Sequence, residues 1–330
     1  MKRTVRIALI VVLIFVAFGN FIQTGYYLIR PGSAESLGDK VQVEGKERDE
    51  EGQFYMVTVA QQEANLWAFL YATFNPVLDL RPISGVIPPG MSLEEYNDIM
   101  QSWMQDSKYL AQVIALQETG YDVSIASDGV EIKDIIPGSP AEGILMAGDV
   151  IKAVEGEYVY LAEELVNLIQ SKEVGEPTSL TVLRGKELMD LVVDTTSHTE
   201  QPEKAALRVY VSTLNWQPLL PLEINIETGP VIGPSAGIMF VLEIMDRLVA
   251  ENLTAGYTIA GTGAISLDGK IGGIGGVKQK VAASERAGIK YFIAPEENYQ
   301  EAIRVAREIE VISVKDLEEV LQFLQGLQDL

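Results

Sequence analysis

The chain has 330 residues, no cysteine, a single histidine and a formal net charge of −22. The missing cysteines exclude thiol nucleophiles, disulfides and thiolate zinc sites, and one histidine argues against a histidine-based metal site, so no metal or other cofactor is expected. An acidic chain lacks the basic face that nucleic acids require, so no nucleic-acid partner is expected. Covalent chemistry is left to serine, threonine, lysine and carboxylates.

An apolar stretch at residues 7–29 predicts a transmembrane helix of roughly 20 residues. Basic residues up to Arg6 precede the stretch and acidic residues follow Arg30, so the positive-inside rule places the amino end in the cytoplasm and the rest outside the cytoplasmic membrane. Tyr26 and Tyr27 would then lie in the interfacial belt. A cleaved signal peptide is the alternative, but no clean small-residue cleavage site follows the stretch.

Residues 31–118 predict a juxtamembrane strand pair followed by helices. In order, we expect a strand at 41–43, a turn at 49–52, a strand at 53–59, a helix at 60–74 and a long helix at 93–118. Ser92 and Glu95 have the spacing of a capping box that opens the last helix.

Residues 119–196 have the element order of a small β-barrel. Pro-Gly-Ser-Pro-Ala at 137–141 and Ala-Gly-Asp-Val-Ile at 147–151 resemble a PDZ domain. The resemblance implies that an extended peptide, often a carboxyl terminus, adds as a strand beside a helix. Its carboxylate loop would lie near Gly120, Tyr121 and Val123. A PDZ fold that only positions another domain is the alternative.

Residues 197–330 predict a third, α/β unit. We expect strands at 207–211, 222–226, 257–265, 291–294 and 311–314, and helices at 234–250, 277–287, 298–307 and 315–325. With the anchor at 1–30, this gives an α+β chain of four parts, divided at residues 30, 118 and 196. The strands at 41–60 could instead open the third unit, in which case the PDZ unit is inserted into it.

Residues 233–237 read Gly-Pro-Ser-Ala-Gly and lead into a helix, which fits the G-x-S-x-G nucleophile pattern. The hydroxyl of Ser235 would be exposed at a helix N-terminus, where the N–H groups of Ala236 and Gly237 can stabilise an oxyanion. No histidine follows Ser235 in the chain, which argues against an ordinary esterase triad and makes a lysine the obvious base.

The helix at 277–287 carries two lysines, Lys278 and Lys280, which point to different sides. Lys280 shares its side with small residues suited to packing, and burial there would lower its pKa, so the pattern favours Lys280 as the base. The Gly-rich loop at 269–276 fails the phosphate-loop spacing, so nucleotide binding is not expected.

Gly-Pro-Ser-Ala-Gly, then Ala-Gly-Thr-Gly-Ala-Ile at 260–265 and Gly-Gly-Val-Lys-Gln-Lys at 275–280 resemble the proteolytic domain of Lon proteases. With the anchor and the PDZ unit, the chain resembles their membrane-anchored, ATPase-lacking branch. The resemblance implies a nucleophile at Ser235, a base at Lys280 and a supporting hydrogen bond from Thr262. Ile232 and Ala264 depart from the usual Lon residues at these positions.

The resemblance implies an ATP-independent serine endopeptidase with a Ser–Lys dyad. It would degrade or process extracytoplasmic proteins that expose unfolded segments or tails, and it would be a homo-oligomer, as Lon-type domains commonly form hexamers. The alternative is a non-catalytic PDZ scaffold that binds protein tails.

Overall fold

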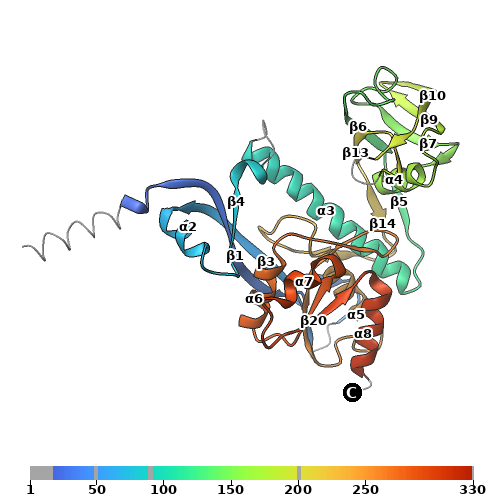
Figure 1. The fold of residues 1–330 in the computed structure, drawn as a ribbon. Helices are drawn as coiled ribbons and strands as arrows, with labels where there is room; N and C mark the ends of the chain where they lie inside the picture. The colour runs from blue at the N-terminus through green and yellow to red at the C-terminus, as the bar shows by residue number, and fades with distance from the viewer. Residues whose placement is uncertain (1–17, 48–50, 88–91, 199–201, 329–330) are drawn as a thin grey trace, which may run out of the picture. The chain divides into compact units, whose positions relative to one another are not determined.

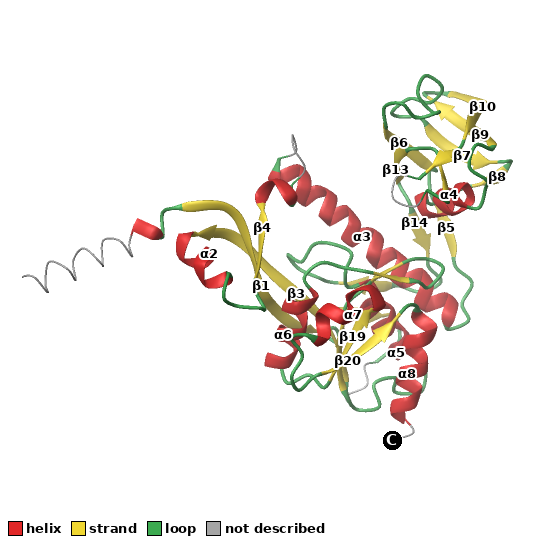
Figure 2. Cartoon of the chain, in the orientation of Figure 1, coloured by secondary structure: helices red, strands yellow, loops and turns green. Residues whose placement is uncertain are grey.

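The computed structural model describes residues 18–47, 51–87, 92–198 and 202–328. The chain divides into two compact units: unit 1 combines the residues up to Asp122 with Leu222–Leu330, and unit 2 is Val123–Pro221. Unit 2 is therefore inserted between the two halves of unit 1. Figure 1 shows the elements by their position along the chain, and Figure 2 by type.

Unit 1 is built on a six-stranded mixed sheet with the order β20-β19-β16-β3-β1-β4. Its strands, with the short pairs β2–β15 and β17–β18, are β1 (Gln23–Ser36), β2 (Val41–Val43), β3 (Gln53–Asn65), β4 (Asp79–Pro82), β15 (Ile224–Ile226), β16 (Thr258–Gly261), β17 (Ala264–Ile265), β18 (Ile271–Gly272), β19 (Tyr291–Pro295) and β20 (Glu310–Val314). Its helices are α2 (Leu66–Ala72), the 3-10 turn η1 (Ile83–Gly85), α3 (Leu93–Glu118), α5 (Gly237–Leu248), α6 (Val277–Arg286), α7 (Glu296–Ile303) and α8 (Leu317–Gln328).

Helices cover both faces of this sheet. Val57, Ala260 and Phe292 pack with Val281 of α6 in one buried cluster. The neighbouring residue Gly261 points to the other face, where a Cβ would come within 2.5 Å of the sulfur of Met239 on α5. Because successive strand residues alternate between faces, α5 and α6 lie on opposite sides of the sheet.

The two strands predicted at 41–43 and 53–59, which are β2 and β3, pair differently from the sequence prediction. β3 does not form a hairpin with β2: it pairs antiparallel with β1 and parallel with β16, while β2 pairs with β15. β3 also continues to Asn65, so the predicted helix at 60–74 is wrong over its first half and survives only as α2. The segment 41–60 is thus part of the same unit as residues 222–328.

The second half of the predicted transmembrane stretch is also a strand. Tyr27, Leu28 and Ile29 are buried in β1 and paired with β3 and β4, which contradicts their predicted place in a membrane helix and that of Tyr27 in the interfacial belt. Residues 1–17 lie outside the described residues. Among the helices that the structure does describe, none has the length and apolar character to cross a membrane.

The long helix α3 agrees with the sequence. Ser92 caps it through a complete capping box with Glu95, so two backbone donors of the first turn are satisfied. α3 packs against α5, which places it behind the turn that carries Ser235.

Unit 2 is built on a small six-stranded sheet with one helix against its edge. The sheet order is β10-β9-β7-β6-β13, with β8 on β7 and the separate pairs β11–β12 and β14–β5. The elements are β5 (Ser124–Ala126), β6 (Val130–Ile135), β7 (Val150–Val154), β8 (Glu157–Tyr158), α4 (Ala162–Gln170), β9 (Pro177–Arg184), β10 (Glu187–Asp194), β11 (Thr196–Ser197), β12 (Ala205–Ala206), β13 (Val209–Thr213) and β14 (Gln217–Leu219). The unit runs to Pro221, beyond the predicted boundary at 196.

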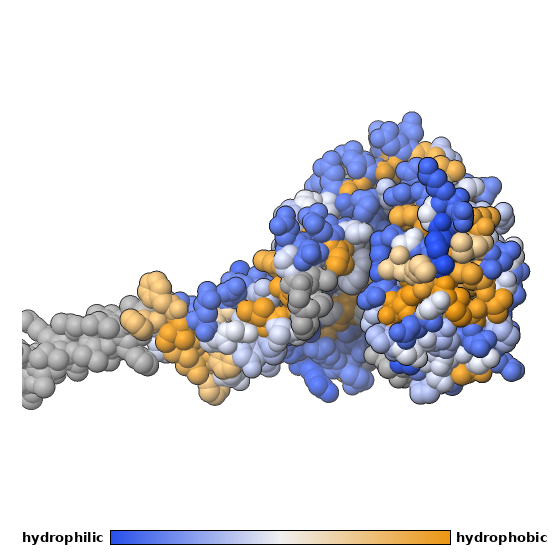
Figure 3. Space-filling model, turned by 90° about the horizontal axis from the view of Figure 1, so that it is seen from above, coloured by the Kyte–Doolittle hydropathy of each residue, from blue (hydrophilic) through white to orange (hydrophobic). Residues whose placement is uncertain are grey.

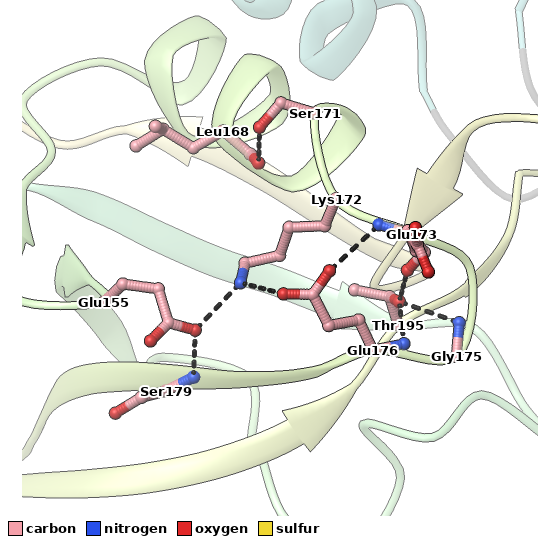
Figure 4. Close-up of polar contacts among 9 residues, drawn as sticks. All are labelled: Glu155, Leu168, Ser171, Lys172, Glu173, Gly175, Glu176, Ser179 and Thr195. Carbon is pink, nitrogen blue, oxygen red and sulfur yellow. Dashed lines mark hydrogen bonds and ion pairs between the residues drawn. The ribbon is translucent and has the colours of Figure 1, made fainter.

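The loop after α4 is held by an ion cluster, drawn in Figure 4. Lys172 lies between two carboxylates, 2.9 Å from Glu155 and 2.9 Å from Glu176. The hydroxyl of Thr195 accepts from the N–H groups of Gly175 and Glu176. These bonds tie the end of α4 to strands β9 and β10, and they fix the helix that borders the groove described below.

Candidate active site

Ser235 lies in a tight turn directly before α5. Gly233 adopts φ +93, a conformation that favours glycine, and the turn residues 234–236 precede the first helical residue, Gly237. The Ser235 side chain is partly exposed, while the helix behind it is buried. A hydroxyl on such a turn can reach a substrate while its backbone stays fixed.

Lys280 comes from the opposite face of the sheet to meet it. Its Nζ lies 2.7 Å from Ser235 Oγ and 2.7 Å from Thr262 Oγ1. The residue is only 3% exposed and Thr262 is fully buried. Burial lowers the pKa of Lys280 to about 7, because the charged form loses its hydration. At this pKa a large fraction of the amine is neutral at about pH 7, and the neutral amine can accept a proton.

Thr262 fixes the direction of this lysine. Its Oγ1 donates to the carbonyl oxygen of Ser235 at 2.8 Å, so its lone pairs are left for an N–H of Lys280. With one N–H directed at Thr262, the nitrogen lone pair of neutral Lys280 can point to Ser235 Oγ. The same carbonyl accepts the N–H of Gly263 at 2.9 Å, which pins the turn to the end of β16.

Two further hydrogen bonds, which the sequence did not predict, hold the turn that carries Ser235 against α3. The hydroxyl of Ser107, 3% exposed, donates to the Pro234 carbonyl at 3.1 Å, and the N–H of Gly233 donates to the Met100 carbonyl at 3.0 Å. A serine about 130 positions upstream carries no local motif, so only the packing of α3 on α5 reveals this contact.

The predicted oxyanion donors are placed unequally. Ala236 is the N-cap of α5, and the N–H of Gly237 donates to the Pro234 carbonyl at 3.3 Å. Gly237 therefore shares its donor with its own turn, which leaves Ala236 as the better candidate.

The other lysine of α6 has a different role. Lys278 forms an ion pair with Asp79 of β4 at 2.6 Å, and the neighbouring Gln279 donates to the same carboxylate at 2.9 Å. Of the two lysines, the structure thus brings only Lys280 to Ser235. No group of histidine, aspartate and glutamate side chains suited to a metal ion occurs among the described residues.

A groove in unit 2 runs between α4 and the segment that leads into β13. Its volume is about 220 Å³, and Leu165, Val166, Leu207, Arg208 and Tyr210 are among the residues that line it. β13 is the last strand of its sheet, so one of its edges faces this groove rather than another strand.

The predicted peptide-binding residues lie elsewhere. Gly120 and Tyr121 form the turn that ends α3 in unit 1, and Val123 is buried at the start of unit 2. None of the three lines the groove. The structure therefore moves the candidate peptide site to residues 205–211, which the sequence had assigned to a different unit.

Comparison with known proteins adds two domain assignments. Residues 222–326 match the Lon protease (S16) C-terminal proteolytic domain, and residues 114–195 match a PDZ domain. Lon protease 2 of Bacillus subtilis is 40% identical over 101 residues, which is 30% of this chain and 18% of that protein. The Lon protease of Mycoplasma mobile is 37% identical over 111 residues, 32% of this chain and 13% of that protein.

The chain thus contains a PDZ domain and a Lon-type proteolytic domain, and these relatives support a serine peptidase. The chain spans less than a fifth of the length of these two relatives. Among solved structures, the PDZ domain of an SdrC-like protein from Listeria monocytogenes is similar at 21% identity and a TM-score of 0.25, covering 27% of this chain and 92% of that one.

Proposed function

We propose that this chain is an ATP-independent, membrane-anchored serine endopeptidase in which Ser235 is the nucleophile and Lys280 the general base. The observation that carries the proposal is the buried Lys280 amine, 2.7 Å from both Ser235 Oγ and Thr262 Oγ1, with a pKa lowered to about 7. A structural lysine would have no reason to be buried beside two hydroxyls without a carboxylate partner.

In the acylation step, the lone pair of neutral Lys280 takes the proton of Ser235 Oγ. The Oγ then bonds to the carbonyl carbon of the scissile peptide, and the N–H of Ala236 at the start of α5 stabilises the oxyanion. The Lys280 ammonium returns the proton to the leaving nitrogen as the C–N bond breaks. An ester between Ser235 and the substrate's acyl group remains.

In the deacylation step, Lys280 takes a proton from a water molecule, whose oxygen attacks the ester carbonyl. The ester C–O bond breaks and the proton returns from Lys280 to Ser235 Oγ. Thr262 keeps the Lys280 amine directed at Ser235 Oγ in both steps, because its own hydroxyl donates to the Ser235 carbonyl.

The groove of unit 2 supports a role in substrate capture. An extended peptide can add to the open edge of β13, beside α4, and place an apolar side chain against Leu165 and Val166. Arg208 lines the same groove and suits a peptide carboxylate. We therefore propose that unit 2 binds unfolded or tail-exposing protein substrates.

The remaining parts of the proposal come from the sequence. The apolar residues 7–22 would anchor the chain in the cytoplasmic membrane, with the amino end inside and the peptidase outside. The chain has no phosphate-loop motif, so hydrolysis is proposed to need no ATP. A homo-oligomer, as in Lon-type hexamers, is proposed by resemblance.

The test is cleavage of an unfolded protein such as casein by the full chain in detergent, without ATP. The full chain is used because β1 begins at Gln23, and a truncation at residue 31 would cut this strand. Ser235→Ala and Lys280→Ala should each abolish cleavage, whereas Lys278→Ala, on the same helix, should keep it.

Full activity in Ser235→Ala would refute the nucleophile. If the wild-type chain were inactive but bound peptides through unit 2, the non-catalytic scaffold would become the better description.

A further inference from the structure

One end of unit 1 has an apolar surface that we call the tip. It joins the residues just before β1 to α2 and the turn after it. Its most exposed side chains are Phe21, 83% exposed, and Phe74, 87% exposed. The full set of exposed apolar residues at the tip is Phe18, Phe21, Ile22, Leu70, Tyr71 and Phe74. Figure 3 shows hydrophobic residues gathered at this projecting end, on the left of the view.

Specific contacts hold the two segments of the tip together. The indole of Trp67 packs on Gly19 so closely that a Cβ there would lie 2.2 Å from its Nε1. The N–H of Leu66 donates to the carbonyl of Ile22 at 3.0 Å. The amide of Asn65 donates to Asn20 at 3.3 Å. The chain that follows the apolar amino-terminal stretch is therefore fastened to α2.

Helix α2 is apolar on both of its faces. Its inner face, with Phe69 and Ala72, packs on the β1–β3 hairpin, and the Phe69 ring meets that of Tyr26 at 5.2 Å between centroids. Its outer face presents Leu70 and Tyr71 to the surroundings. A helix on a protein surface that faces water normally has polar residues on its outer face. Helix α2 has apolar residues there, so its composition is that of a helix covered on both sides.

The tip is also free of charge in a strongly acidic protein. Residues 7–29 and 64–78 contain no aspartate, glutamate, lysine or arginine, although the chain has a net charge of −22. The two uncharged stretches meet at the tip, because Gln23 pairs with Asn65. Exposed aromatic and aliphatic side chains without charge are typical of protein surfaces at the boundary of a bilayer.

We propose that the tip inserts into the boundary between the headgroups and acyl chains of the lipid bilayer. This inference rests on the proposed membrane anchoring. The end of the apolar stretch is already part of the tip, since Gly19 and Ile22 contact Trp67 and Leu66 of α2. A chain anchored by the residues just before them would therefore hold Phe21, Ile22 and α2 at the membrane boundary.

The test uses the absence of cysteine in the chain. Single cysteines replace Phe74 at the tip (Phe74→Cys) or, as the control, Ile303 on α7 in the body of the same unit (Ile303→Cys). Each full-length variant receives an environment-sensitive fluorophore and is reconstituted in phosphatidylcholine vesicles. Casein cleavage by the labelled proteins, compared with the unlabelled chain, verifies that the fold is intact.

At position 74 we expect blue-shifted emission and quenching by a lipid spin-labelled near its headgroup, several-fold stronger than at position 303. Added phosphatidylglycerol should not change this, because the tip carries no basic residue to attract it. The tip proposal is overturned if iodide in the water quenches the label at position 74 to the same extent as the control label at position 303.

Flotation of the vesicles separates this failure from a failure of anchoring. If the protein floats with the vesicles but its position-74 label is in contact with water, the chain is anchored and the tip is not inserted. If the protein does not float, both the membrane anchoring and the tip insertion are refuted. A label shielded from iodide but not quenched by lipid shows that a second protein copy covers the tip, which also overturns the proposal.

Discussion

Replacing Lys280 by methionine should stabilise unit 1 in a pH-dependent manner. The pKa of Lys280 is about 7 in the folded protein against an ordinary value of 10.5, so folding makes its protonation harder. The destabilisation is full below about pH 7 and disappears as the pH rises towards 10.5. The pKa difference corresponds to about 5 kcal/mol at about pH 6 and about 1.5 kcal/mol at about pH 9.5.

Methionine keeps the length of the side chain but loses the hydrogen bonds to Ser235 and Thr262, each worth about 1 kcal/mol. Lys280→Met should therefore raise the free energy of unfolding by about 3 kcal/mol at about pH 6 and leave it nearly unchanged at about pH 9.5. The assay is urea unfolding followed by tryptophan fluorescence in a Trp216→Phe background, in which Trp67 and Trp103 both report on unit 1.

Lys278→Met is the matched control, since Lys278 lies on the same helix as Lys280 but is ion-paired with Asp79 of β4. It should lower the free energy of unfolding by about 1 kcal/mol or less at either pH. A Lys280→Met effect of the same size at both pH values would refute the reasoning, because the pKa of Lys280 would then be the same in the folded and unfolded protein.

Three further outcomes are expected. The kcat/KM for casein should rise about tenfold per pH unit below about 7 and then level off, because protonated Lys280 cannot act as a base; a profile falling across this range would contradict the assignment. Ser107→Ala should lower kcat by up to about tenfold, because the hydrogen bond to the Pro234 carbonyl is lost. The KM and the midpoint of the pH profile should not change. A shifted midpoint would mean that Ser107 takes part in the proton transfer instead. Lys172→Met should lower the urea midpoint of unit 2 near neutral pH but not in acid. The pKa values of Glu155 and Glu176 are lowered mainly by their hydrogen bonds to Lys172, and the stabilisation that these bonds give is lost as the carboxylates are protonated. An equal loss of stability in acid would mean that packing of the Lys172 side chain, and not its charge, is responsible.

The core of the candidate site could be predicted because its residues lie in local patterns. Ser235 is marked by glycines that a sharp turn requires, and Lys280 by the side of α6 that it shares with small residues. The structure brings these two together with Thr262. Ser107 could not be predicted, since its bond to Pro234 depends on how α3 packs against α5.

Long-range pairing explains what the sequence did not reveal about the fold. Residues 60–65 have helical composition, yet they continue β3 because β1 lies beside them; local propensity yields to such pairing. Tyr27, Leu28 and Ile29 extend an apolar run that looks like part of a membrane helix, but β1 needs the same residue types for a strand between β3 and β4. The groove beside α4 was not predicted, because β13 lies far along the chain from β6, its partner in the sheet.

The parallel pairing of β3 with β16 has a consequence for biosynthesis. Gln53 lies opposite Thr258, so the amino-terminal hairpin has to wait for about two hundred further residues before its neighbour leaves the ribosome. At about 5–20 residues per second this takes on the order of ten to forty seconds, during which unit 2 is synthesised in full. Ser235, Thr262 and Lys280 all follow unit 2 in the chain. During synthesis the chain therefore completes unit 2, the proposed peptide-binding unit, before any of the three proposed active-site residues has been made.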